Sequence, residues 1–133
     1  MKALDTPILL ALLEGDRAAQ DAIRRFRGHE VATTEANLLE LVLIAGGTGH
    51  ARGARREAIG RLRRRLTVLP LDASAVNEIG RRAADKELAR LPLHVLAMLG
   101  ALEASGCEEL LTDQTALPGK WRFKISHLRR SKN

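Results

Sequence analysis

The chain has 133 residues and a formal net charge of +6, and it is 45% hydrophobic but only 2% aromatic. This length suits one compact domain, whose core must then be built from aliphatic side chains. Cys107 is the single cysteine of the sequence, so an internal disulfide framework is excluded. No apolar run reaches the roughly 20 residues of a membrane span. We therefore expect a cytoplasmic protein with no membrane segment.

The first 45 residues alternate between short apolar segments and helical patterns. Pro7 fits the first turn of a helix, Gly15-Asp16 ends that helix, and Thr33 and Thr34 can cap a later one. The expected elements are, in order, a strand at 2–5, helices at 7–13 and 16–27, a strand at 30–33 and a helix at 35–45.

The alternation continues after residues 46–49, Gly-Gly-Thr-Gly, which are expected to end the preceding helix. Ala54, Ala58, Ile59 and Leu62 are spaced toward a core. The expected elements are a helix at 51–65, a strand or extended link at 67–71, a helix from Asp72 or Ser74 to about Arg90, a helix at 92–105 with Gly106 as its C-cap, and strands at 109–112 and 121–125. Strands separated by helices indicate an α/β fold with helices covering a parallel sheet.

We expect this fold to form a single domain over residues 1–126, followed by a basic, frayed tail over 127–133. Three acids, Asp5, Glu40 and Asp113, follow a predicted strand or lie on the helix beyond one. Parallel strands end at one edge of the sheet, where α/β folds bind ligands, so these carboxylates are expected to converge. Converging carboxylates bind hard divalent cations, and such an ion acidifies a bound water.

Simpler explanations exist for two of these acids. Asp113 can cap a turn, and Glu40 can be an ordinary helix acid. However, Glu40 lies in an apolar stretch, residues 38–43, where a buried charge without a partner is costly. Asn37 lies one turn earlier on the same helix face and is expected to hydrogen-bond the Glu40 carboxylate. Asp5 is the hardest of the three to explain by capping or packing.

The segments around these acids resemble the PIN domain family, especially its VapC-type toxin ribonucleases. Leu4-Asp5-Thr6-Pro7-Ile8-Leu9 is similar to the start of the family's domain. Residues 33–41 are similar to the family's second motif, which carries a Glu, and residues 101–113 resemble its late helix, strand and threonine motif. The resemblance implies a three-layer α/β/α sandwich with a central, mostly parallel sheet of four or five short strands. It also implies Mg²⁺- or Mn²⁺-dependent RNA cleavage, a homodimer and, in toxin–antitoxin pairs, a small antitoxin protein.

The sequence departs from this family at two positions. His94 stands where the family has a third acid at the start of the late helix, and Gln114 stands where it has an acid or Asn after the threonine. Asp113 lies one residue away from that second position, and Asp85 lies too early to replace His94. A neutral imidazole does not replace a carboxylate for Mg²⁺, although it suits softer ions such as Mn²⁺ or Zn²⁺.

The expected metal ligands are therefore Asp5, Glu40 and Asp113. His94 is a further catalytic candidate, as a metal ligand or a general acid/base, and a structural histidine bonded to a backbone carbonyl is an equal alternative. The side chains expected to orient the carboxylates or contact a phosphate are Thr6, Asn37, Thr112 and Gln114.

Arginines crowd residues 51–65, where Glu57 is the one acid, and 24–27 carries a smaller cluster. Such a surface captures RNA through its phosphates, but a soluble outer helix is the simpler explanation of the cluster, and compositional bias also explains the charge. Residues 46–49 lack the Gly-Lys-Ser/Thr ending of a phosphate loop. Two functions stay open: a metal-dependent ribonuclease that acts as a toxin, and a catalytically degenerate PIN-like module that binds RNA or a protein partner without cleavage.

Overall fold

The computed structural model describes residues 1–45, 52–114 and 117–128. Within these ranges the strands form one parallel sheet in the order β3-β2-β1-β4-β5. The strands are β1 (Lys2–Leu4), β2 (Val31–Thr34), β3 (Thr67–Leu69), β4 (Glu109–Thr112) and β5 (Lys124–His127). The α/β fold with a parallel sheet that the sequence predicts is therefore confirmed.

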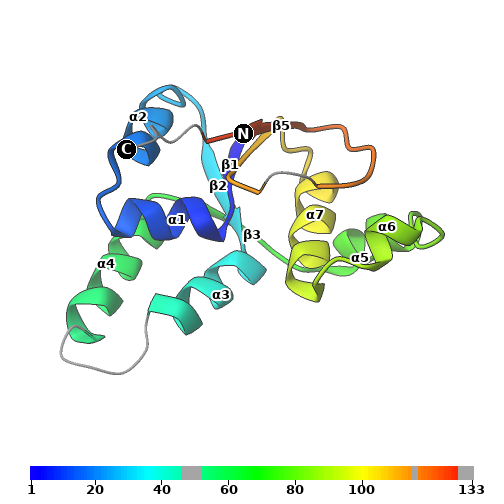
Figure 1. Ribbon diagram of the computed structural model, residues 1–133, viewed down its shortest axis with the longest axis horizontal. Helices are drawn as coiled ribbons and strands as arrows, with labels where there is room; N and C mark the ends of the chain where they lie inside the picture. The colour runs from blue at the N-terminus through cyan, green and yellow to red at the C-terminus, as the bar shows by residue number, and fades with distance from the viewer. Residues whose placement is uncertain (46–51, 115–116, 129–133) are drawn as a thin grey trace.

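Helices cover both faces of this sheet. Figure 1 shows α5, α6 and α7 on one side and α1, α2 and α4 on the other. Within the described ranges, no helix is long and apolar enough to cross a membrane. The helices are α1 (Thr6–Leu13), α2 (Arg17–Arg24), α3 (Glu35–Ala45), α4 (Arg52–Arg64), α5 (Ala73–Gly80), α6 (Lys86–Ala89) and α7 (Leu93–Ser105).

The sheet separates two apolar cores, because successive strand side chains point to opposite faces. Ala3 and Leu110 pack into the core formed with α5, α6 and α7. Their neighbours Leu4 and Leu111 pack into the other core, which α1, α2, α3 and α4 help to form. The predicted three-layer α/β/α arrangement is thus confirmed.

The strand order reverses its direction between β1 and β4. From β1 the chain proceeds outward through β2 and β3, whereas β4 and β5 extend the sheet on the other side of β1. In open α/β sheets, such a switch point opens a crevice beyond the carboxyl ends of the strands. Helix α3 starts at the carboxyl end of β2 and contacts both α1 and α7, so it bridges the two helical layers at this edge.

The helix expected from Asp72 or Ser74 to Arg90 is wrong as one element. Asp72 caps α5 by accepting a hydrogen bond from the Ala75 N–H (3.0 Å), but α5 ends at Gly80. Asp85 then accepts the N–H groups of Glu87 and Leu88 and so caps a new helix, α6. Strong N-cap residues inside a helical pattern favour such a restart.

Three further details differ from the sequence-based elements. Ala54, expected to face the core, is exposed. The last strand begins at Lys124, because the Arg122 N–H donates to a side chain, the Glu103 carboxylate (3.0 Å), instead of a strand. At its far end, β5 includes His127, and Leu128 is buried with its N–H bonded to the Thr112 carbonyl (2.8 Å). His127 is therefore part of β5, and Leu128 is bonded to the end of β4, although both fall in the segment expected as a tail.

Some sequence-based expectations concern residues that the structure does not describe. Residues 46–49, expected to end a helix and rejected as a phosphate loop, lie outside the described ranges. The same holds for residue 51, the expected start of a helix, and for 129–133 of the expected tail.

Candidate functional site

Asp5 lies at the switch point, directly after β1, and its side chain is 0% exposed. Its Oδ1 accepts a hydrogen bond from the Ile8 N–H (3.4 Å), as the N-cap of α1. Its Oδ2 accepts a hydrogen bond from the Thr112 hydroxyl at the end of β4. One carboxylate therefore connects β1, α1 and β4 at the carboxyl edge of the sheet.

The environment of Asp5 disfavours its negative charge. Burial raises the pKa of Asp5 from 3.8 to about 6, although the hydrogen bonds from Thr112 and Ile8 act in the opposite direction. The negative charges of Asp113 and Glu40 raise this pKa further. Capping explains the position of one carboxylate oxygen. It does not explain why Asp5 is buried near two further acids, where a cation would stabilise its negative charge.

Thr112 organises the turn that carries Asp113. Its hydroxyl donates to Asp5, and its oxygen accepts a hydrogen bond from the Gln114 N–H (3.0 Å). Asp113, between these two residues, is partly buried, and its charge acts on Asp5. The strand that pairs with β1 thus brings a second acid to the same edge of the sheet.

Glu40 lies on α3, where His94 from the first turn of α7 is its partner. The Glu40 Oε2 and His94 Nε2 atoms are 2.9 Å apart, and the two side chains are 26% and 45% exposed. The apolar sequence around Glu40 does not bury it, because Leu39 and Leu43 are themselves exposed while Leu41 faces the core. The expected partner of Glu40 exists, but it comes from another helix.

Asn37 does not bond Glu40, contrary to the sequence-based expectation. Its Oδ1 accepts a hydrogen bond from the Thr34 hydroxyl (2.6 Å), and its Nδ2 donates to the Thr6 hydroxyl (3.1 Å) and lies 3.4 Å from Met98 Sδ. Asn37 is buried between α1 and α7, whereas Glu40 lies on the more exposed side of α3.

Thr6 is committed to the same buried network. Besides accepting from the Asn37 amide, its hydroxyl donates to the Asn37 carbonyl (3.3 Å). These bonds fasten α1 to α3, so they fix the helix that starts beside Asp5 against the helix that carries Glu40.

The contribution of Met98 was not predicted, because a methionine on an apolar helix carries no signal that distinguishes it from other core residues.

The three carboxylates provide oxygen donors of the kind that Mg²⁺ and Mn²⁺ prefer. Across the described ranges, no group of three or more His, Cys, Asp or Glu side chains is arranged so that it could hold a metal ion. A Mg²⁺ ion, however, takes only one or two carboxylates and keeps several waters. Asp5 is buried and feels the negative charges of both Asp113 and Glu40.

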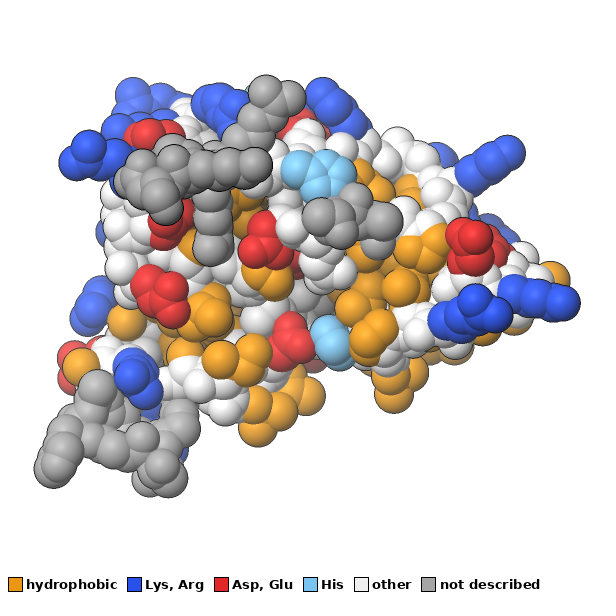
Figure 2. Space-filling model, viewed as in Figure 1, with side chains coloured by type: hydrophobic (Ala, Val, Ile, Leu, Met, Phe, Trp, Pro, Cys, Tyr) orange, Lys and Arg blue, Asp and Glu red, His pale blue; other side chains and the backbone are white. Residues whose placement is uncertain are grey.

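An open apolar cleft adjoins the Glu40–His94 pair. It has a volume of about 750 Å³ and lies between α3, the start of α7 and the segment after β3. Figure 2 shows hydrophobic side chains gathered on this face beside acidic and histidine side chains. Among the lining residues, Leu39, Leu43, Leu71 and Leu93 are exposed. The sequence did not reveal this cleft, because the same leucine pattern is typical of buried helices.

Helix α4 provides a basic surface. The side chains of Arg55, Arg56, Arg61, Arg63 and Arg64 are exposed. Glu57, the one acid in this helix, lies 4.0 Å from Arg61, and both are largely in solvent, so this pair adds little stability. The excess positive charge therefore faces the solvent.

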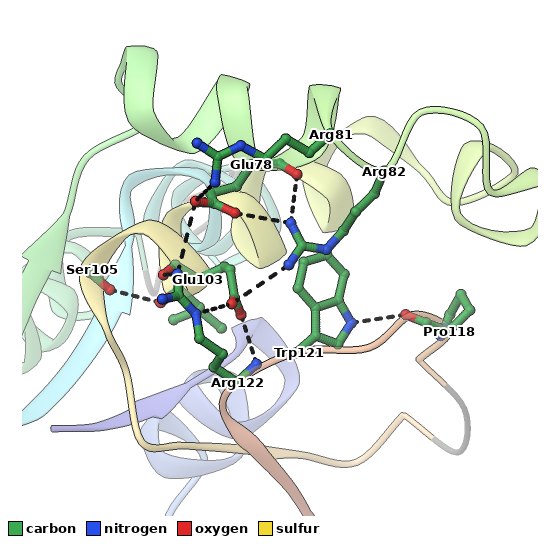
Figure 3. Close-up of polar contacts among 9 residues, drawn as sticks. Glu78, Arg81, Arg82, Glu103, Ser105, Pro118, Trp121 and Arg122 are labelled. Atoms are coloured by element: carbon green, nitrogen blue, oxygen red, sulfur yellow. Dashed lines mark hydrogen bonds and ion pairs between the residues drawn. The ribbon is translucent and has the colours of Figure 1, made fainter.

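A second cluster of charged side chains joins α5, α7 and the segment before β5 (Figure 3). The Glu103 side chain is 1% exposed and accepts hydrogen bonds from Arg122 Nε (2.6 Å) and the Arg122 N–H (3.0 Å). Arg82 reaches Glu103 (3.6 Å) and Glu78 (3.0 Å), and its guanidinium lies 4.5 Å from the Trp121 ring centroid. Because these groups satisfy one another, we interpret the cluster as a structural clamp.

Comparison with known proteins agrees with this geometry. A sequence model described as PIN domain matches residues 2–102, and no curated protein matches the chain. VapBC2 from Rickettsia felis, bound to a DNA fragment from its promoter, is similar with a TM-score of 0.80 and 13% identity over 95% of this chain and 97% of that one.

Two further solved structures cover nearly the whole chain. DNA-bound VapBC from Salmonella typhimurium has a TM-score of 0.76 and 19% identity, over 96% of this chain and 98% of that one. VapBC-5, a member of the VapBC family of toxin–antitoxin systems from Mycobacterium tuberculosis, has a TM-score of 0.64 and 22% identity, over 97% of this chain and 98% of that one. At these identities the likeness shows the fold.

Proposed function

Because the chain belongs to the PIN domain family, we propose that it is a VapC-type ribonuclease that cleaves RNA phosphodiester bonds with Mg²⁺ or Mn²⁺. The observation that carries this proposal is the buried Asp5 at the switch point of the sheet, whose pKa is raised to about 6 by burial and by the charges of Asp113 and Glu40. A structural N-cap needs no such surroundings, whereas acids with a perturbed pKa cluster at functional sites.

In this proposal, Asp5, Asp113 and Glu40 hold the ion. A bound divalent ion supplies a positive charge next to the phosphate and an acidified water. Thr112 fixes the Asp5 carboxylate through its hydroxyl, and His94 fixes the orientation of Glu40. These contacts hold both acids in place before substrate arrives, which limits the reorganisation needed for reaction.

The remaining predicted site residues have positioning roles in this proposal. Thr6 and Asn37 hydrogen-bond each other and so hold α1 against α3. Gln114, whose N–H is bonded to Thr112 (3.0 Å), offers a neutral amide at the edge of the site. An amide supplies hydrogen bonds to a phosphate without adding a charge that would repel it.

RNA is the proposed substrate because the protein combines a basic surface on α4 with an acidic centre. The net charge of +6 and the exposed arginines of α4 attract a polyanion. The acidic centre itself requires a cation before a phosphodiester can approach. This combination favours a metal-dependent nuclease over a simple RNA-binding surface.

We further propose a homodimer and a small antitoxin as protein partners, in the cytoplasm. Two observations support partners of this kind. The similar structures include VapBC toxin–antitoxin systems, and exposed leucines surround the cleft between α3 and α7. Exposed apolar surface of this kind typically marks a contact with another protein.

The direct test is RNA cleavage by the purified chain with Mg²⁺, with Mn²⁺ and with a chelator. We expect cleavage that requires the ion and is lost in Asp5→Asn, because asparagine keeps the helix cap but removes the charge. Asp16→Asn is the matched control, since Asp16 caps α2 by accepting the Ala19 N–H (3.1 Å). Salt-sensitive RNA binding without cleavage under either ion would instead support the degenerate binding module.

A further inference from the structure

A second apolar cleft, the α3–α4 cleft, lies between α3, α4 and β3 and has a volume of about 560 Å³. Helices α3 and α4 are neighbours in the fold (Figure 1). The apolar lining of the cleft comes from Leu38, Leu39, Val42, Ile59 and Val68. Leu39 is 63% and Val42 48% exposed, whereas Ile59 is buried. The cleft thus has an apolar floor and an apolar wall that the described part of the chain leaves open to solvent.

The other wall of the α3–α4 cleft is basic. Arg56 and Arg63 line it from α4 and are both exposed. Among the described residues, neither guanidinium has an ion-pair or hydrogen-bond partner. Glu35 also lines the cleft, but its Oε1 already accepts the Leu71 N–H (3.1 Å). Two positive charges therefore stand beside the apolar surface without a partner in the described chain.

Two other occupants suit this cleft less well than an acidic protein segment. Single-stranded RNA binds through aromatic stacking platforms, and no aromatic side chain of the described residues lines the cleft. A second copy bound symmetrically sets one patch against the same patch. It would bring Arg56 and Arg63 close to their own counterparts, and like charges facing each other across an interface disfavour binding.

We propose that the α3–α4 cleft binds an acidic amphipathic helix of a protein partner. Such a helix places its apolar side chains in a groove at helical spacing, here against Leu39 and Val42, and its Asp or Glu side chains pair with Arg56 and Arg63. The two arginines are seven residues apart on α4, about 10 Å along its axis, which matches carboxylates two turns apart on a helix lying along the cleft. The inference deepens the proposed protein partnership and rests on it, but it requires neither metal nor RNA.

The test selects ligands from a random peptide library displayed on phage, with the full chain as the target and a chelator present. Peptides of about 16 residues are long enough for about four helical turns. The selected peptides are synthesised, labelled and titrated by fluorescence polarisation against the wild type and four variants. Circular dichroism checks that each variant folds, which we expect because every substituted side chain is exposed.

The charge variant is Arg56→Gln with Arg63→Gln. Its matched control is Arg55→Gln with Arg64→Gln, which removes the same charge from the same helix at positions that do not line the cleft.

The apolar variant is Val42→Ser. Its matched control is Val76→Ser, because Val76 is also exposed, at 59%, but lies on α5 away from the cleft.

We expect the selection to enrich peptides with apolar residues at helical spacing and with acids about seven positions apart. The charge variant should bind them about tenfold more weakly, because two charge pairs are lost, and Val42→Ser about threefold more weakly. Both controls should bind like the wild type. A selection that enriches no acidic peptides, or an equal loss of binding in the charge variant and its control, would overturn the inference.

Further outcomes separate this inference from the alternatives. Peptide binding that depends on Arg56 and Arg63, in a protein that cleaves no RNA, supports the inference and removes the ribonuclease. Metal-dependent cleavage by a protein that selects no acidic peptide overturns the inference and leaves the ribonuclease in place. Apolar peptides without acids, together with a dimer that Val42→Ser dissociates in analytical ultracentrifugation, would assign the cleft to a second copy and also overturn the inference.

Discussion

Replacing Asp5 by asparagine is expected to stabilise the protein at neutral pH while it abolishes function. The pKa of Asp5 is about 6 in the folded chain and 3.8 in its reference state, so ionising Asp5 opposes folding. One pKa unit corresponds to about 1.4 kcal/mol, which gives a penalty of about 3 kcal/mol when the carboxylate is charged in both states. Asparagine removes that charge and still serves as an N-cap.

The pH dependence of this effect follows from the direction of the pKa shift. Well below pH 3.8, Asp5 is protonated in the folded and unfolded chains, so it carries no penalty. As the pH rises from 3.8 to about 6, the unfolded chain loses this proton first, and the penalty grows to its full value. The stability gained by Asp5→Asn should therefore be largest near neutrality and vanish in acid.

Urea unfolding in the presence of a chelator, at about pH 8 and about pH 3, measures this difference. We expect Asp5→Asn to be more stable by up to about 3 kcal/mol at the higher pH and equal to the wild type at the lower one. Asp16→Asn, which changes a cap outside the site, should show no such pH-dependent gain. A variant that is no more stable than the wild type at about pH 8 would refute the inference that Asp5 carries an uncompensated charge.

Three further predictions concern substrate capture and the fold. If RNA is the substrate, its binding should weaken steeply as salt rises, because Arg side chains displace counterions from phosphates, and a filter-binding titration over salt checks this. Glu103→Gln should cost about 1–3 kcal/mol in urea unfolding because it leaves a buried cluster unbalanced, whereas Glu57→Gln on the surface should change little. Gly100→Ala should lower Tm, since its Cβ would meet the Ala75 carbonyl oxygen at 2.5 Å, while Gly53→Ala, with nothing within 4 Å, should raise it.

Much of the fold follows from local sequence patterns. Short apolar segments separated by helices predict the parallel sheet, and Thr34 caps α3 where the sequence expects a helix to start. Asp5 and Asp113 were predicted to meet because both follow strands, and strands β1 and β4 do pair side by side. The order of strands across the sheet is not encoded locally, so the switch point itself came from the structure.

The side-chain partners were harder to predict, because they depend on how helices pack. Asn37 and Glu40 share one face by spacing, yet tertiary contacts with Thr6 and Met98 draw Asn37 into the interior. Glu40 finds its partner on a helix far along the chain, at His94. Likewise, Asp85 restarts a helix inside a pattern that favours one continuous helix. Sequence periodicity predicts which residues share a helix face, but not which other helix that face will meet.

The most direct measurement is anomalous X-ray scattering from crystals soaked in Mn²⁺. We expect a manganese peak at the carboxyl edge of the sheet, within ligand distance of Asp5 or Glu40 and near Asp113, and no such peak in Asp5→Asn. Crystals saturated with Mn²⁺ that show no peak between these carboxylates, or a peak only elsewhere on the surface, would contradict the claim that they form an ion-binding centre.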